Sequence, residues 1–132
     1  MLRLACFLLS IPLALSAQER LTGNDFDAFT RGQTFYYGYD LEAYGAEEYL
    51  DDRRVRWSFL DGECKDGYWY DTPENLICFV YEDRPDAPQC WAFFKDNNKL
   101  RATFENGAQA APLYQIEKTE TLMICTGPKI GV

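Results

Sequence analysis

The sequence predicts a mainly β fold: a small antiparallel meander, barrel-like or a rolled sheet, with one short N-terminal helix and two disulfides. Short segments rich in aromatic and β-branched residues recur between turn-forming residues from Gln33 onward, as is typical of small all-β domains. One of them, residues 53–60, alternates apolar and polar side chains as a half-buried strand does. Four cysteines in the last 115 of the 132 residues then predict two disulfide bonds.

Residues 1–17 have the three-part layout of a secretory signal peptide. Arg3 precedes an apolar run, and the small residues Ser16 and Ala17 follow it. The run spans about a dozen residues, whereas a membrane-spanning helix needs about twenty. We therefore expect cleavage after Ala17, or alternatively after Ser16, and no membrane span afterwards. Residues 18–132 would form a single domain in the periplasm or be secreted; a retained N-terminal anchor is the alternative.

Residues 21–32, LTGNDFDAFTRG, predict the single helix. Thr22 is a suitable N-cap with an acidic residue three positions later, and Gly32 can end the helix. Phe26 and Phe29 fall on one helical face. We expect that face to dock on the rest of the domain.

The remaining chain predicts strands separated by turns. The dipeptides Asp61-Gly62, Asp66-Gly67 and Asn106-Gly107 are typical of turns or hairpins. The segment Asp96-Asn97-Asn98 predicts a hairpin turn and lacks the spacing of a calcium loop. The predicted strands are residues 33–40, 45–50, 53–60, 67–71, 76–82, 89–95, 100–104, 112–118 and 121–125.

The cysteine positions predict which disulfides form. Four cysteines allow three connectivities. LICFVYE and QCWAFFK flank an acidic, proline-containing segment and predict a hairpin in which Cys78 lies opposite Cys90. Directly opposed residues have the short Cα separation that a disulfide requires. The remaining pair is Cys64 with Cys125, and both bonds are interpreted as staples of the fold.

The charge balance excludes two classes of partner. Without residues 1–17 the chain holds 12 basic and 21 acidic residues, a net charge of −9. Nucleic acids and anionic membrane surfaces both require clusters of Lys and Arg. A cationic protein partner fits this charge, although acidity that serves only solubility is the alternative.

The segments DGEC-x2-GYWY, ICFVYE and QCWAFF together resemble an uncharacterised family of small exported, periplasmic β proteins of Gram-negative bacteria. The shared pattern is GxW…CFxYE…CW, and the likeness covers residues 21–104. The resemblance implies an exported location and a β fold. Its motifs are structural, so it implies no catalytic residue.

The residue types argue against an enzyme. The chain has no histidine, which removes the commonest general base and the Ser-His and Cys-His nucleophile systems. No CxxC pair is present for a redox reaction or a zinc site. Glu47, Glu48, Asp51 and Asp52 are the densest carboxylates and could serve glycoside hydrolysis or calcium binding. Because they flank a predicted turn, we interpret them as a solvated acidic rim, and we expect no catalytic residue, cofactor or metal.

Aromatic side chains are the candidate binding groups. Consecutive aromatics on a strand must point to both of its faces, so some members of Tyr36-Tyr37 and Tyr68-Trp69-Tyr70 face away from the core. Strands are also tyrosine-rich through β propensity alone. The candidate ligand or interface residues are Tyr36, Tyr37, Tyr68 and Tyr70, and the expected core tryptophans are Trp57, Trp69 and Trp91.

Two function classes follow from these observations. The first is a periplasmic, non-catalytic binding or interaction module whose partner is an unknown, cationic protein. Inhibitors of lysozyme are also small, exported, disulfide-bearing β barrels, and an acidic surface would steer such a protein toward a basic enzyme. The alternative is a carrier that holds a small apolar or sugar ligand in an aromatic-lined barrel interior.

Overall fold

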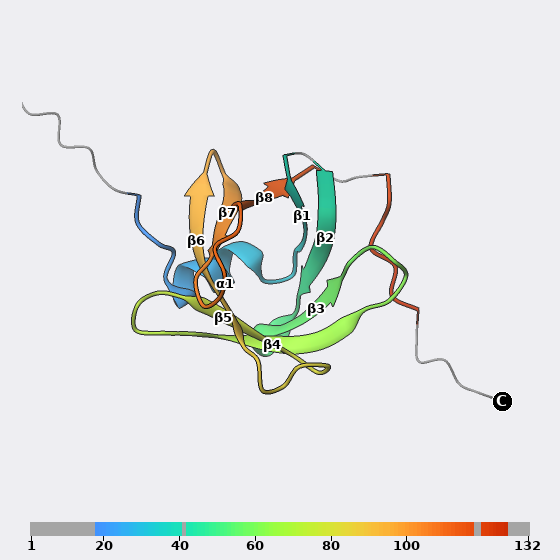
Figure 1. The fold of residues 1–132 in the computed structure, drawn as a ribbon, viewed down its shortest axis with the longest axis horizontal. Helices are drawn as coiled ribbons and strands as arrows, with labels where there is room; N and C mark the ends of the chain where they lie inside the picture. The colour runs from blue at the N-terminus through green and yellow to red at the C-terminus, as the bar shows by residue number, and fades with distance from the viewer. Residues whose placement is uncertain (1–17, 41, 118–119, 127–132) are drawn as a thin grey trace, which may run out of the picture.

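The protein is an eight-stranded antiparallel barrel with one short helix (Figure 1), seen in a computed structural model that describes residues 18–40, 42–117 and 120–126. Each strand pairs with the next, and β8 returns to pair with β1, which closes the barrel. The predicted β meander is confirmed, and the predicted signal peptide lies outside the described residues. The elements are α1 (Gly23–Thr30), β1 (Thr34–Tyr39), β2 (Glu42–Tyr49), the 3-10 turn η1 (Asp51–Arg53), β3 (Arg54–Ser58), β4 (Lys65–Asp71), β5 (Ile77–Tyr81), β6 (Gln89–Asp96), β7 (Lys99–Phe104) and β8 (Leu113–Ile116).

The helix α1 forms where its capping residues predict it. The Thr22 hydroxyl accepts a hydrogen bond from the Asp25 backbone N–H at 3.1 Å, which satisfies one of the free donors of the first turn. Gly32 adopts a φ of 76°, in the left-handed region that glycine occupies without strain. Phe29 packs against Phe35 of β1 at a ring-centroid distance of 5.5 Å, so the predicted docking face is confirmed.

Phe26 of α1 is the centre of the core. Its side chain is completely buried and lies edge-on to Tyr49 of β2 and Trp69 of β4, with centroid distances of 5.6 and 5.1 Å. It also contacts Phe79 of β5 and Phe93 of β6, at 6.3 and 4.5 Å. Phe26 therefore joins four strands of the barrel and fills one end of its interior.

Both predicted disulfides are confirmed. Cys78 and Cys90 lie directly opposite each other in the β5–β6 ladder, with their Cα atoms 3.9 Å apart. The second bond joins Cys64 to Cys125 across a sequence separation of 61. Disulfides persist in oxidising environments, so the pair indicates a non-cytoplasmic location. In the part of the chain described here, no helix has the length and apolar character needed to cross a membrane.

Two of the predicted local features are wrong. Asp66-Gly67 is not a turn but part of β4, where Gly67 pairs with Val55 and a Cβ there would collide with the Tyr81 strand. Glycine is used at this position for close backbone approach. Residues 121–125 are not a strand. The disulfide and a hydrogen bond from the Met123 N–H to the Tyr36 hydroxyl at 3.0 Å hold this segment without a ladder.

The hairpin turn between β6 and β7 is confirmed. Asn97 and Asn98 have φ values of 49° and 63°, which match a type I′ turn and its preference for asparagine. Asn106 and Gly107 lie in a bend of the longer connection between the antiparallel strands β7 and β8, as the turn dipeptide predicts. The Asn106 side chain accepts from the Cys90 N–H and donates to the Pro88 carbonyl, both at 2.8 Å, and so fastens the segment after β7 to the start of β6.

Candidate binding cavity

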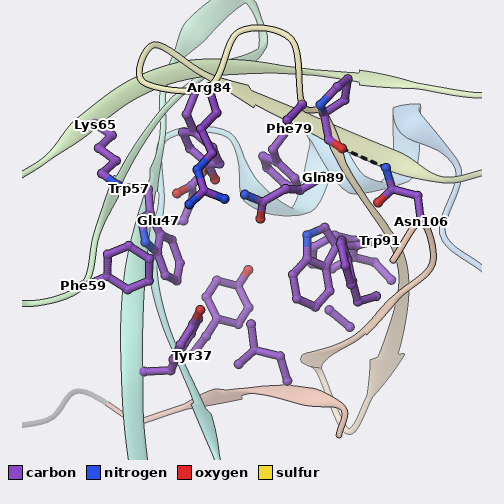
Figure 2. A pocket seen from close by; sticks show the side chains of 18 of the residues that line it. Tyr37, Glu47, Trp57, Phe59, Lys65, Phe79, Arg84, Gln89, Trp91 and Asn106 are labelled. Carbon is purple, nitrogen blue, oxygen red and sulfur yellow. Dashed lines mark hydrogen bonds between the residues drawn. The ribbon is translucent and has the colours of Figure 1, made fainter. Parts of the chain in front are cut away.

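The barrel interior contains a cavity of about 560 Å³ (Figure 2), bordered by core residues such as Phe79 and Phe93. Drug-sized ligands occupy clefts of about 300 to 1,000 Å³, mostly lined by apolar and aromatic groups. The walls come from positions on β1, β2, β3, β5, β6, β7 and β8. Their principal aromatic side chains are Tyr37, Tyr49, Trp57, Phe79, Tyr81 and Trp91.

The mouth of the cavity is polar and partly exposed. The loop from residue 82 to residue 88 connects β5 to β6, and from it Arg84 reaches the cavity (Figure 2). Beside this loop lies Lys65, whose ammonium pairs with Asp83 of the loop at 2.8 Å and sits over the ring of Phe59, which is 45% exposed. The Arg84 guanidinium has no ion pair or hydrogen bond with any described residue. The mouth therefore contains one guanidinium outside any close ion pair, although Arg84 and Asp83 attract each other electrostatically.

Glu47 of β2 is the most unusual side chain of the cavity. It is only 1% exposed and points into the barrel, because the inward positions of β2 alternate through Glu47 and Tyr49. Its Oε1 accepts a hydrogen bond from the Tyr81 hydroxyl at 2.9 Å. Its Oε2 is buried and has no hydrogen-bond partner among the described residues. A buried polar atom without a partner is rare and costs free energy, so it marks a position where a further group is expected.

Burial controls the ionisation of this group. Removal from water raises the pKa of Glu47 well above its ordinary value of 4.5, and the hydrogen bond from Tyr81 opposes that rise. Burial likewise raises the pKa of Tyr49 and of Tyr81 well above 10, and the neighbouring Glu47 adds to both shifts. The cavity therefore favours a neutral carboxylic acid and neutral phenols when nothing else is bound in it.

A second hydrogen bond orders the tyrosines beneath Glu47. The hydroxyls of Tyr37 and Tyr49, on β1 and β2, lie 2.7 Å apart in a buried hydrogen bond. Burial raises the pKa of Tyr37 above its ordinary value. Together with Tyr81 these residues place three phenol groups near one carboxyl in an otherwise apolar interior. Such an arrangement can bind and orient a ligand, while none of these groups is an activated nucleophile.

The structure separates the four aromatic residues that the sequence singled out. Tyr37 lines the cavity. Tyr36 faces the other side of β1 and is held by Met123. Tyr68 and Tyr70 lie on the outer face of β4, 52% and 38% exposed, with no part in the cavity. Among the expected core tryptophans, Trp69 is buried, whereas Trp57 and Trp91 are half-buried and form cavity walls.

The predicted acidic rim is wrong for Glu47. Only Glu48, which is half-buried and 3.7 Å from Arg56, and the exposed Asp51 and Asp52 face outward. Consecutive residues of a strand point to opposite faces, so Glu47 and Glu48 cannot share a surface. Within the described ranges, no cluster of three or more carboxylate or cysteine ligands could hold a metal ion.

The sequence analysis also did not identify Tyr81 and Trp91 as residues that line the cavity. The available signal was alternation: Tyr81 and Phe79 share a strand face, as do Trp91 and Phe93. That signal identifies two faces of each strand without stating which one encloses a cavity.

Comparison with known proteins found no matching family model, no similar curated protein and no similar solved structure.

Proposed function

We propose that this protein is a non-catalytic binding protein of the periplasm or extracellular space that carries a small, largely apolar ligand inside its barrel. The observation that carries this proposal is the buried Oε2 of Glu47, which has no hydrogen-bond partner in the described part of the chain and belongs to a residue that lines an aromatic cavity. Apolar walls provide binding free energy in proportion to the area they cover. A few convergent polar groups then fix the orientation of the ligand.

The cavity geometry favours a carrier over the interaction module. The interaction interpretation depends on net charge, which is a property of the whole surface. The carrier interpretation depends on specific atoms: Glu47 and Tyr81 inside the cavity, and Arg84 at its mouth. Phe26 fills the other end of the barrel interior, so the 82–88 loop provides the entrance that a ligand would use.

A fluorescence titration with N-phenyl-1-naphthylamine, a neutral apolar probe, tests this proposal. Trp57 and Trp91 line the cavity and would transfer excitation to a bound probe. We expect saturable binding to the wild-type protein. Ala102→Phe should weaken probe binding at least about tenfold. Ala102 is 1% exposed and belongs to the cavity wall, so the larger ring would occupy the space that the probe needs.

Two further variants control this experiment. Ala43→Phe places the same ring on an exposed position of β2, away from the cavity, and should leave probe binding unchanged. Ala87→Trp alters the exposed entrance loop without entering the core, so it should weaken binding even if Ala102→Phe fails to fold. Absence of saturable binding to the wild type, or equal binding to all four proteins, would refute a ligand site inside the barrel.

A further inference from the structure

We propose that the ligand carries a positively charged amine, and that this amine pairs with the Glu47 carboxylate deep in the aromatic cavity. The inference rests on the proposed function, and it names the chemical class of the ligand. Three observations support it: the unpartnered oxygen, the aromatic surroundings, and the lack of an ion pair between Glu47 and any described cation.

The unpartnered oxygen sets the position of the charge. The hydroxyl of Tyr81 donates a hydrogen bond to Oε1 of Glu47 and thereby fixes that side of the carboxyl group. Oε2 is left buried, with no donor among the described residues. A ligand N–H group can satisfy this oxygen, and a charge-assisted hydrogen bond between an ammonium and a carboxylate is stronger than one between neutral groups.

The aromatic rings favour a cation over a neutral donor. Tyr37, Tyr49 and Tyr81 lie close enough to Glu47 to interact with it electrostatically, and Trp57 stands on the same side of the cavity (Figure 2). The faces of tyrosine and tryptophan rings attract ammonium groups, and the attraction increases when water is excluded. A carboxylate among aromatic side chains can therefore recognise an amine through both its charge and its apolar surroundings.

Among the residues that the structure describes, no side chain forms an ion pair with Glu47. The charged and titratable groups around Glu47 are the tyrosines of β1, β2 and β5, with Lys65, Asp83 and Arg84 at the mouth. Lys65 is paired with Asp83. Arg84 forms no close ion pair with Glu47 or with any other described residue. A cation that neutralises Glu47 must therefore come with the ligand.

Binding of an amine should release a proton. In the empty cavity burial favours the neutral acid form of Glu47, as the raised pKa indicates. An ammonium ion enters with its own proton retained, the carboxylic acid loses its proton to water, and an ammonium–carboxylate pair remains. The charge balances, with one proton released for each ligand bound. A neutral ligand that uses the same cavity releases none.

Isothermal titration calorimetry with three probes of matched shape tests the inference. The probes are 2-phenylethylamine, 2-phenylethanol and phenylacetate, which share an apolar body and carry a positive, a neutral and a negative group. Near neutral pH we expect the amine to bind at least about tenfold more tightly than the alcohol, because its hydrogen bond is charge-assisted. Phenylacetate should bind most weakly. Titrations in buffers of different ionisation enthalpy should show proton release with the amine and none with the alcohol.

Two matched variants assign the effect to one residue. Glu47→Gln keeps the size of the side chain and removes its charge, so the preference for the amine and the proton release should both disappear. Glu48→Gln removes a carboxylate from the outer face of the same strand and should change neither. Circular dichroism reports whether each variant is folded. If Glu47→Gln does not fold, the wild-type comparison of amine with alcohol still decides the question.

The outcomes separate this inference from the proposed function. Equal affinity for amine and alcohol, or an amine preference that survives in Glu47→Gln, would overturn the inference while the cavity remains a ligand site. Tightest binding of phenylacetate would also overturn it and would assign recognition to Arg84. If none of the three probes binds although N-phenyl-1-naphthylamine does, the inference again fails alone. If that naphthyl probe does not bind either, the proposed function fails with it.

Discussion

Replacement of Glu47 by glutamine should change the way in which stability depends on pH. Glu47 is buried to 1% exposure, and burial raises its pKa well above 4.5. The substitution preserves the shape of the side chain, and its amide oxygen can still accept the hydrogen bond of the Tyr81 hydroxyl. The amide does not titrate. The difference between variant and wild type therefore isolates one ionisation.

The sign and size of the effect follow from proton linkage. Between pH 4.5 and the pKa of the folded state, the unfolded chain ionises Glu47 while the folded barrel keeps it protonated. The wild type therefore loses stability as the pH rises, by at most about 1.4 kcal/mol for each pH unit in this interval. Below pH 4.5 Glu47 is protonated in both the folded and the unfolded state, so its ionisation no longer lowers the stability of the wild type. The stability of Glu47→Gln relative to wild type should accordingly increase with pH.

Urea denaturation with the disulfides intact, monitored by tryptophan fluorescence at intervals from about pH 4 to about pH 9, measures this difference. The three tyrosines that interact with Glu47 do not titrate in that range, because burial raises their pKa values above 10. Tyr81→Phe removes the hydrogen bond that opposes the shift, so the decline should extend to higher pH. A stability difference that is independent of pH, or one that falls as pH rises, would refute the description of Glu47 as a buried neutral acid.

Three further predictions concern the frame of the cavity. Phe26→Ala should lower the free energy of unfolding by about 3 to 5 kcal/mol, because it leaves a void among four strands; a loss below about 1 kcal/mol in urea denaturation would contradict this role. Replacing Cys78 and Cys90 together by alanine should cost about 3 kcal/mol by loop entropy, and unchanged unfolding of this variant would show that the bond adds nothing. Tyr37→Phe breaks the hydroxyl pair with Tyr49 and should cost about 1 kcal/mol, whereas an equal or higher denaturation midpoint would show that the pair is not stabilising.

The fold class could be predicted because its signals are local. Thr22 caps the helix through its own side chain, and Asn97-Asn98 selects the hairpin turn through its backbone preference. Cys78 and Cys90 face each other because the short segment between them can only return antiparallel. Each signal involves residues close in the chain, so their spacing alone carries the information.

The local errors arose where a local signal had two structural meanings. Asp66-Gly67 resembles a turn dipeptide, yet the glycine is needed because the Tyr81 strand approaches its backbone closely. Residues 121–125 have the composition of a strand. They are instead held by the disulfide between Cys125 and Cys64, and they pair with no strand of the barrel. In both cases a contact with a distant segment decided the conformation.

The sequence by itself determined an acidic, disulfide-stapled chain of short antiparallel strands with one capped helix. Only the tertiary structure decided that Glu47 faces inward while Glu48 faces outward, since a strand pattern defines two faces without naming the enclosed one. Closure of β8 onto β1 and the insertion of Phe26 created the inside of the barrel. Those contacts join segments far apart in the chain, so the cavity and its unpartnered carboxylate exist only once the barrel has closed.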